Sequence, residues 1–279
     1  MDAPGKLVSI IVPTLNSAKF LERCLVSLKA QTYPNIEIIL VDNFSKDATI
    51  EIAKKFTDSI YQIGPERSTQ INFGFSKAKG DYLYRVDSDF VVDKDVVNEA
   101  VSMCGSGYDA LCIPNISDPS VSFWSKVRNF ERNFYVNDTL NVAARFLTRK
   151  VYEDVGGFDE TLIAGEDYDL HNRILKKHYR IGMTKATEMH LGEPATLMEV
   201  LRKHYYYGKS IKSFTDKNEE RGMKQISVVR PSFLRGWREF YRHPDMAVGF
   251  FVYQASRYSA SMLGVFSTLF RKRKNGAHD

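Results

Sequence analysis

The stretch LVSIIVPT, residues 7–14, decides the fold of this chain. Its first six residues are almost all apolar, and the run ends at Pro13, as is typical of a strand buried in a parallel sheet. Apolar side chains then recur at helical spacing between residues 20 and 28, and a second apolar run covers Ile36 to Val41. The order strand, helix, strand predicts a unit of an α/β fold.

Polar residues follow each expected strand at its carboxyl end. Thr14 follows the first strand, Asp42 follows the second, and the motif Asp87-Ser88-Asp89 follows a strand expected over Tyr82 to Val86. Right-handed crossovers place the carboxyl ends of parallel strands at one edge, where open α/β sheets hold their ligands. We therefore expect these side chains to meet in one site.

The remainder of the chain divides into two parts. Strands and helices continue to alternate, with strands expected over 109–114 and 143–147 and a helix over 124–135. We therefore predict an α/β domain over residues 1–195, with a mostly parallel central sheet flanked by helices. Residues 196–279 are expected to form a basic, aromatic-rich helical extension.

Composition excludes several classes of protein. Hydrophobic residues make up 43% of the chain and charged residues 26%, which excludes a disordered or fibrous protein. The three cysteines, Cys24, Cys104 and Cys112, lack CxxC spacing, so neither a disulfide framework nor a cysteine metal site is predicted. Met1 opens a polar stretch without an apolar signal core, and we expect the protein to stay on the cytosolic side.

Charge is unevenly distributed along the chain. Residues 201–279 hold 16 Lys and Arg against 6 Asp and Glu, a net +10, whereas the first 200 residues hold 23 against 28, a net −5. Such a basic segment favours a polyanionic partner, either nucleic acid or an anionic lipid surface. Because no recognition-helix, aromatic-platform or zinc-finger signature is present, we expect no nucleic acid partner.

Two acidic motifs suggest chemistry at the expected sheet edge. The carboxylates of Asp87 and Asp89 suit a hard divalent cation and a ribose, although a solvated loop has the same pattern. Glu166-Asp167 precedes a helical pattern, where Asp167 is a candidate general base and acidic capping of the helix is the alternative. His190 follows a short expected strand and is either a structural histidine or a metal ligand.

Taken together, the motifs resemble glycosyltransferase family 2, whose members have the GT-A fold. The resemblance covers residues 7 to 192 and implies a Rossmann-like α/β domain, here with a C-terminal helical extension that associates with membranes. It is carried by five ordered motifs: Val8-Ser9-Ile10-Ile11-Val12-Pro13-Thr14-x-Asn16, Ile39-Leu40-Val41-Asp42-Asn43-x-Ser45-x-Asp47, Asp87-Ser88-Asp89, Gly156-Gly157-Phe158-Asp159 and Glu166-Asp167.

The resemblance implies which residues hold a nucleotide. Pro13, Thr14 and Asp42 line its pocket, and Asp42 accepts a hydrogen bond from the base. For Arg67, which the resemblance places facing the donor, an exposed loop arginine is the alternative. The other residues assigned to this pocket are Asn16, Arg67, Asp87 and Ser88.

The resemblance also implies a metal-dependent transfer. Asp89 ligates Mg²⁺ or Mn²⁺, and His190 completes the metal site. Asp167, beside Glu166, takes the proton from an attacking hydroxyl, and a single in-line displacement inverts the anomeric carbon. The sugar moves from a nucleotide-diphosphate donor, foremost a UDP-sugar with GDP-mannose as the alternative, to a lipid-linked or membrane-held glycan.

Three other functions remain open. A polyprenyl-phosphate sugar synthase has an acceptor that is already anionic and hardly needs a base. The Glu166-Asp167 pair therefore mildly disfavours this function. A basic nucleotide- or nucleic-acid-binding module would show no sugar turnover. A family member that only binds donor would lack a carboxylate of the site, whereas Asp42, Asp89 and Asp167 are all present.

The C-terminal extension has features of a membrane-surface segment. Arg257 divides the apolar run Met246–Phe270 into charge-free pieces shorter than the ~20 residues of a spanning helix. We expect this segment, with the basic run Arg271–Lys274, to lie on an anionic membrane at its cytoplasmic face, as a peripheral or monotopic attachment. Packing on protein is the alternative. Its polar and apolar residues fall on opposite helical stripes: Gln254, Arg257, Ser261 and Thr268 against Phe250, Phe251 and Leu263.

Overall fold

The structure is a computed structural model that describes residues 5–136, 138–162 and 164–275. The chain divides into two compact units, each built from three separate stretches of sequence. Unit 1 comprises the described residues of Met1–Ile116, Val142–Thr161 and Glu166–Gly192, and unit 2 comprises those of Ser117–Asn141, Leu162–Gly165 and Glu193–Asp279.

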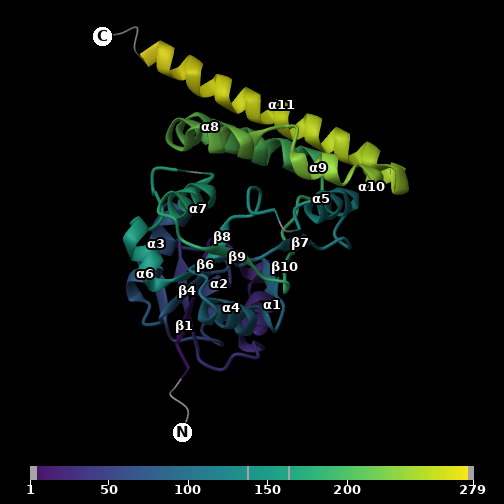
Figure 1. Ribbon diagram of the computed structural model, residues 1–279. Coiled ribbons are helices and arrows are strands. Elements are labelled where there is room, and N and C mark those ends of the chain that lie inside the picture. Colours follow the sequence, from purple (N-terminus) through teal and green to yellow (C-terminus); the bar gives the residue numbers. More distant parts are fainter. Residues whose placement is uncertain (1–4, 137, 163, 276–279) are drawn as a thin grey trace. The chain divides into compact units, whose positions relative to one another are not determined.

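Unit 1 (Figure 1) is built on a seven-stranded sheet, and the strand order is β3-β2-β1-β4-β8-β6-β9. Strand β1 is parallel to β2 and β4, and β6 is parallel to β9, whereas β8 is antiparallel to both β4 and β6. The mostly parallel central sheet predicted from the sequence is therefore confirmed. The strands are β1 Val8–Thr14, β2 Ile36–Asp42, β3 Ile60–Gln62, β4 Tyr82–Arg85, β6 Ala110–Cys112, β8 Ala144–Thr148 and β9 Ile181–Met183.

The register of the strands brings the predicted residues to one edge. Thr14 pairs with Asp42 across β1 and β2, and β4 ends two residues before Asp87. A second sheet has the order β5-β10-β7, where β5 is Phe90–Val92, β10 is Glu188–His190 and β7 is Asn115–Ser117. Because His190 pairs with Phe90 in this sheet, it lies next to Asp89.

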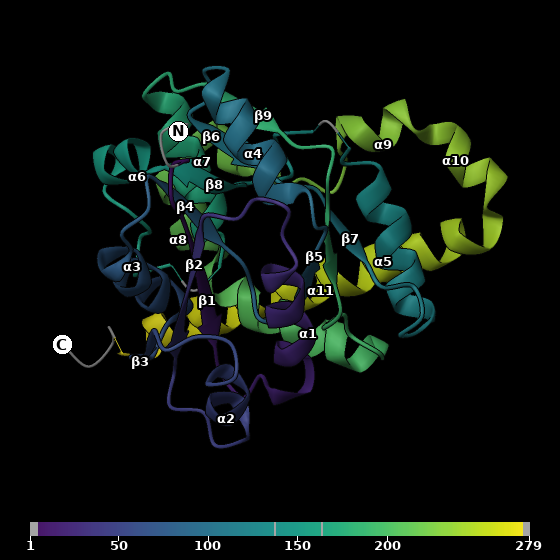
Figure 2. The ribbon, with the colours of Figure 1, turned by 90° about the horizontal axis from the view of Figure 1, so that it is seen from below.

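Helices of unit 1 pack on the large sheet (Figure 2). Helix α3 contacts β1 and β2, α6 contacts β4 and β8, and α7 contacts β8, while α1 lies against β5 and α2. A Cβ at Gly74 of α3 would come within 2.5 Å of the Ile11 side chain, so glycine lets this helix approach β1 closely. The helices are α1 Ala18–Lys29, α2 Thr49–Ala53, α3 Arg67–Lys77, α4 Val96–Gly105, α6 Arg149–Val155 and α7 Glu166–Lys176.

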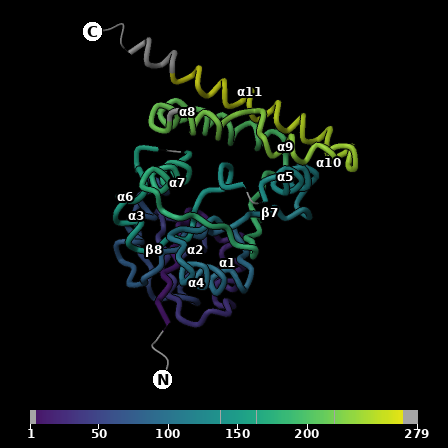
Figure 3. The backbone as a smooth tube through the Cα atoms, in the orientation of Figure 1, coloured from purple at the N-terminus to yellow at the C-terminus, as the bar shows by residue number. Residues whose placement is uncertain are grey.

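Unit 2 is helical, and its helices α8 and α11 lie side by side (Figure 3). The helix start expected at Thr196 is present, since the Thr196 hydroxyl accepts a hydrogen bond from the Glu199 N–H (3.3 Å). Over the described residues, no helix combines the length and apolar character that crossing a bilayer requires. The helices are α5 Phe123–Asn133, α8 Leu197–Ile226, α9 Pro231–Arg235, α10 Trp237–Arg242 and α11 Pro244–Asn275.

Two glycines let α8 and α11 touch through their backbones. A Cβ on Gly264 would come within 2.3 Å of the Tyr205 carbonyl oxygen, and a Cβ on Gly208 would come within 2.2 Å of the Ser261 carbonyl oxygen. Such distances leave no room for a side chain, because a backbone carbonyl cannot turn aside. The two helices therefore form one closely packed pair.

A buried ion pair joins α5 to α11. Glu131 is fully buried and accepts hydrogen bonds from Arg128, from Arg257 (3.0 Å) and from the Tyr135 hydroxyl (2.6 Å). Burial would raise the pKa of Glu131, but the arginine charges outweigh it and hold that pKa well below its usual range. The carboxylate is thus charged, and its partners fix the position of α11 on α5.

Candidate active site

Asp42, at the end of β2, is fully buried and fully hydrogen-bonded. Its Oδ1 accepts from the hydroxyls of Thr14 (2.8 Å) and Ser45, and its Oδ2 accepts from the Ser45 N–H (2.8 Å) and the Gln62 amide (3.3 Å). Four bonds use the acceptor positions that a carboxylate offers. A further donor therefore binds Asp42 only by displacing one of these, and the longest bond is that of Gln62.

The loop after β1 is tied to two neighbouring loops. Asn16 has a left-handed backbone conformation (φ 48°), and its N–H donates to the Ser45 hydroxyl (2.7 Å). The Ser17 hydroxyl lies 2.8 Å from the hydroxyl of Ser88, in the acidic motif. The strand register and the hydrogen bonds of Asp42, Asn16 and Ser17 thus bring residues from three separate motifs to one edge: Pro13, Thr14, Asn16, Asp42 and Ser88.

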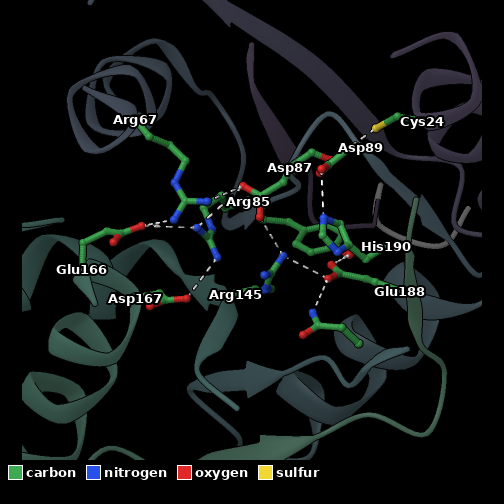
Figure 4. A network of polar contacts seen from close by, with 12 residues as sticks. Cys24, Arg67, Arg85, Asp87, Asp89, Arg145, Glu166, Asp167, Glu188 and His190 are labelled. Carbon is green, nitrogen blue, oxygen red and sulfur yellow. Dashed lines mark hydrogen bonds and ion pairs between the residues drawn. The ribbon is translucent and has the colours of Figure 1, made fainter. Parts of the chain in front are cut away.

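Asp87 lies among three arginines (Figure 4). Arg67 lies 3.3 Å from one of its carboxylate oxygens, Arg85 lies 3.8 Å from the same oxygen, and Arg145 lies 3.3 Å from the other. Burial would raise the pKa of Asp87, but the charges of these arginines outweigh burial and hold that pKa well below its usual range. Asp87 is therefore ionised at neutral pH.

Arg85 is a buried cation that the sequence motifs did not reveal. It ends β4 and is 1% exposed, and within the part of the chain that the structure describes none of its guanidinium nitrogens has a hydrogen-bond partner. It lies 3.7 Å from Asp167, 3.8 Å from Asp87 and 4.0 Å from Glu166. Since unmade hydrogen bonds of a buried charge cost free energy, Arg85 offers N–H donors for an acceptor that enters the site.

Arg145 and Glu188 form a second ion pair beside the acidic motif. Arg145 donates to Glu188 at 3.1 Å, and Glu188 is fully buried and accepts further bonds from the Tyr84 hydroxyl and the Asn115 amide. Burial would lower the pKa of Arg145, but Glu188 and Asp87 raise it above its ordinary value. Arg145 thus remains charged and links Asp87 to the small sheet.

Asp89 and His190 face each other across the small sheet. His190 Nε2 lies 2.9 Å from Asp89 Oδ2, and the imidazole is stacked on the Phe90 ring with centroids 4.7 Å apart. A Cβ on Gly192 would come within 2.2 Å of that carboxylate oxygen, so the absence of a side chain at this position leaves space for the Asp89 carboxylate. The two residues predicted as metal ligands are therefore neighbours. Among the described residues, however, no group of three or more His, Cys, Asp or Glu side chains is suited to hold a metal.

Glu166 and Asp167 open helix α7 and differ in their access to solvent. Glu166 is buried, with one carboxylate oxygen bonded to Arg67. Asp167 has a side chain that is 24% exposed; its Oδ1 accepts from the Tyr168 N–H (2.9 Å), and its Oδ2 lies 3.7 Å from Arg85. Both carboxylates benefit from the positive end of the helix dipole. Asp167 is the one of the pair that a solvent-borne group can reach.

The residues that the motifs missed share a recognisable signal. Arg85 interrupts the apolar run of residues 82–86, Arg145 interrupts that of 143–147, and Glu188 is a buried charge on the short strand β10. A charged side chain inside an apolar strand needs a partner, because an unpaired buried charge is costly. Arg67 heads α3 and is paired with Asp87 and Glu166, in contrast to an isolated loop arginine.

Known proteins resemble this chain in sequence. The family model "Glycosyl transferase family 2" matches residues 9–157. The chain is 30% identical over 225 residues to the glycosyltransferase AglE of Haloferax volcanii, covering 72% of this chain and 72% of the relative. Of four other curated relatives, among them an uncharacterized glycosyltransferase of Rickettsia felis that is 25% identical, the chain spans 27% to 59% of the length.

Solved structures show the same fold. A mannosyltransferase of Pyrobaculum calidifontis, in complex with GDP-Man and Mn²⁺, has a TM-score of 0.60 at 17% identity and covers 98% of this chain and 80% of that one. Residues 1–349 of S. aureus TarS, in complex with UDP-GlcNAc, have a TM-score of 0.54 at 18% identity and cover 95% and 92%. With a family model that spans more than half of its residues and a fold shared with these enzymes, the chain belongs to glycosyltransferase family 2.

Proposed function

We propose that the chain is an inverting glycosyltransferase that moves a sugar from a nucleotide-diphosphate donor to a hydroxyl of a lipid-linked or membrane-held glycan. The observation that supports this most is the gathering of Asp87, which follows β4, and Asp167, at the start of α7, around the cations Arg67, Arg85 and Arg145 (Figure 4). A UDP-sugar is the donor we expect, with GDP-mannose as the alternative. Since the solved relatives hold UDP-GlcNAc in one case and GDP-Man in the other, both donor classes belong in any test.

The nucleotide subsite is assigned to Pro13, Thr14, Asn16, Asp42 and Ser88. The nucleotide base donates a hydrogen bond to Asp42 and displaces the Gln62 amide, whose bond is the longest of the four that the carboxylate accepts. Arg67 is 45% exposed, so its guanidinium can turn from its carboxylates towards the donor diphosphate. The ionised Asp87 lies beside Arg67 and also approaches the donor.

Asp89 and His190 fit a divalent cation such as Mg²⁺ or Mn²⁺. A carboxylate oxygen and an imidazole nitrogen, 2.9 Å apart, supply two ligands of types found in Mn²⁺ sites, and water and phosphate oxygens suit the remaining positions. When bound, such a cation neutralises charge on the departing diphosphate. In its absence, the short contact between Asp89 and His190 serves as the hydrogen bond that holds both side chains in place.

Asp167 is the proposed general base. Its Oδ1 is held by the Tyr168 N–H, which leaves Oδ2, on the side of Arg85, to accept the proton of the acceptor hydroxyl. Glu166 is buried and bonded to Arg67, so we assign it a positioning role. The hydroxyl oxygen then attacks the anomeric carbon as the diphosphate leaves from the opposite side.

One observation favours a second candidate, a polyprenyl- or dolichyl-phosphate sugar synthase. The N–H groups of Arg85 make no hydrogen bonds to described residues, and a guanidinium is well suited to a phosphate oxygen. In that reaction, the acceptor phosphate itself is the nucleophile and Asp167 is dispensable. The effect of replacing Asp167 therefore separates the two functions.

The acceptor is expected at an anionic membrane surface, with the chain attached at the cytoplasmic face without spanning it. The net +10 charge of residues 201–279 and the aromatic side chains of α9 and α10 support this attachment. The non-enzymatic alternative is a basic nucleotide- or nucleic-acid-binding module. It would bind without sugar turnover.

The first experiment is a screen of UDP- and GDP-sugars with the full chain, with and without Mn²⁺ or Mg²⁺. A bound donor stabilises the folded chain by mass action, so the midpoint of thermal unfolding should rise with one donor class and rise further with metal. Donor hydrolysis is followed in parallel. Absence of any donor response would contradict the proposed function.

Replacing Asp167 with Asn tests the base. We expect turnover to fall at least ~100-fold, the scale for loss of a general base, while thermal stabilisation by the donor stays near that of the wild type. Asp154→Asn, which alters an exposed carboxylate of α6 paired with Lys177, is the matched control and should turn over normally. A wild-type rate for Asp167→Asn would assign the reaction to an anionic acceptor instead.

A further inference from the structure

Helix α11 exposes a continuous uncharged face. The exposed positions recur every three or four residues, so they form a single stripe along the helix. Over the described side chains of α11 beyond Asp245, no charged residue belongs to this stripe. The stripe, called here the outer face of α11, consists of Val248, Phe251, Val252, Ala255, Ser259, Met262, Leu263 and Phe266.

The polar side chains of α11 point the other way, into unit 2. Gln254 is buried, and neither atom of its amide has a hydrogen-bond partner among the described residues. Arg257 is paired with Glu131 at 3.0 Å, and the Ser261 hydroxyl lies 3.3 Å from the His204 carbonyl oxygen. A helix on a water-facing protein surface has the opposite polarity. The stripe that sequence periodicity identified as polar is thus the inner face. The prediction was wrong for Phe250, which was expected on the apolar stripe but is buried on the inner side.

Aromatic and cationic side chains lie next to this helix in the chain. Helices α9 and α10 directly precede α11 and expose Trp237 and Tyr241, together with Leu234. Tryptophan and tyrosine favour the headgroup region of a bilayer, where the ring is partly buried and the polar edge stays wet. Three arginines on the same helices are exposed: Arg235, Arg238 and Arg242.

The charges identify the occupant of the outer face. A second copy of this chain would bring the same exposed arginines, so an interface between copies would set like charges near one another. An anionic bilayer supplies both an apolar layer for Phe251 and Phe266 and phosphate groups for the arginines. The basic run Arg271–Lys274 lies within α11, but its side chains are outside the part of the chain that the structure describes.

We infer that the outer face of α11 inserts into the interfacial layer of an anionic bilayer, with Arg235, Arg238 and Arg242 on the headgroup phosphates. This inference deepens the membrane attachment in the proposed function and rests on it. It also specifies the orientation of the helix: the bilayer faces Val248 and Phe266, and Gln254 faces protein.

Flotation of the full chain with vesicles tests the inference. Vesicles contain phosphatidylcholine alone or with one third phosphatidylglycerol. We expect the double variant Phe251→Asp with Phe266→Asp to partition at least tenfold more weakly than wild type on anionic vesicles, because both residues are exposed and the change places two charges on the outer face. Val26→Asp, at an exposed apolar residue of α1, is the matched control and should partition as wild type does.

Fluorescence distinguishes insertion from adsorption. The chain already contains Trp124 and Trp237, so the comparison is with wild type. Leu263→Trp should add fluorescence that lipids with brominated acyl chains quench, whereas the fluorescence added by Val26→Trp should not be quenched. Changing Arg235, Arg238 and Arg242 together to Glu should weaken partitioning on anionic vesicles at least tenfold. It should also flatten the dependence on salt.

Two results would overturn the inference. Wild-type partitioning of the Phe251→Asp, Phe266→Asp variant would exclude the outer face, and a dimer that this variant abolishes, with no vesicle binding by wild type, would make a second copy the occupant. Donor-dependent stabilisation and partitioning of the wild-type chain report on the two proposals separately. Partitioning without a donor response contradicts only the sugar transfer, and a donor response without partitioning on anionic vesicles contradicts only the docking.

Discussion

At the scale of single residues, the site is organised by arginines as much as by its acidic motif. Asp87 has three of them as neighbours, and Glu166 is bonded to Arg67. Buried carboxylates keep their charge only beside an opposite charge, so each cation holds an acid in its ionised form. Arg85 differs from the others because it is near three carboxylates and hydrogen-bonded to none of the described ones.

Replacing Arg85 with Met should reduce turnover at least tenfold and lower the midpoint of thermal unfolding. Without the shared cation, Asp87, Glu166 and Asp167 repel one another, and a carboxylate left without its partner costs on the order of 3–5 kcal/mol when buried. Arg85→Lys should restore part of the rate, because it returns the charge without the planar group. Steady-state rates and unfolding midpoints check this.

Arg23→Met is the control for Arg85, since Arg23 is an exposed arginine of α1. It should leave both turnover and stability unchanged. If Arg85→Met instead kept the wild-type rate and stability, Arg85 would have no part in the site.

At the scale of elements, the helix pair α8 and α11 is set by backbone contact. Gly264 and Gly208 each face a carbonyl oxygen of the other helix, at distances that exclude a Cβ. The buried ion pair of Glu131 and Arg257 then fixes α11 on α5. Close approach and charge pairing together determine which face of α11 turns outwards.

Gly264→Ala should destabilise unit 2 by about 1–3 kcal/mol, the usual cost of overpacking. The added Cβ meets a carbonyl oxygen at 2.3 Å, and a backbone atom has no rotamer with which to move away. Gly105→Ala is the control, because nothing lies within 4 Å of its Cβ and alanine favours a helix. Urea unfolding followed by circular dichroism measures both. Equal stability of the two variants would show that the helices do not pack this closely.

His204 of α8 should make the chain sensitive to acid. Burial, reinforced by Arg257 and Arg128, lowers the pKa of His204 from 6.5 to about 3. Between these pH values the unfolded chain binds a proton that the folded chain does not, so stability falls as pH falls, by up to about 1.4 kcal/mol per unit.

His204→Gln should therefore flatten the loss of stability between pH 7 and pH 4. His178→Gln, at an exposed histidine of unit 1, should not change that slope. Unfolding free energies at four pH values within this range decide the matter, and identical slopes for wild type and His204→Gln would refute the burial of this imidazole.

At the scale of the whole molecule, neither compact unit is one continuous stretch of the sequence. Residues 117–141 group with the C-terminal helices, because Val127 and Phe130 of α5 share a core with Phe250 and Tyr253 of α11. The candidate catalytic residues all belong to unit 1. The division into domains predicted after residue 195 stays a prediction.

Deleting residues 231–279 should therefore unfold part of unit 2 as well as remove α9, α10 and α11. The deletion exposes the core around Phe130 and takes Arg257 from Glu131. We expect the truncated chain to bind a hydrophobic dye and to lose more helix than the deleted segments account for. A truncated chain that keeps the remaining helical signal and does not bind dye would contradict the shared core.

The acidic motifs and the strands that precede them were predictable because they are local. A strand end followed by Asp42 or by Asp87-Ser88-Asp89 is visible in the sequence, and the parallel register then brings these ends together. The pairing of Arg85 with Asp167 and of Arg145 with Glu188 was not predictable in the same way. Each joins residues more than forty positions apart, and only folding selects the partner.

The sequence by itself determined the family, the α/β fold, the acidic residues of the site and the polar and apolar stripes of the last helix. The tertiary structure alone decided which stripe faces outwards, that Asp42 is already saturated by its neighbours, and that Arg85 is buried without a hydrogen bond to the described chain. The physical reason is that periodicity and motifs report local chemistry. Burial and charge pairing depend instead on which distant segments the folded chain places in contact.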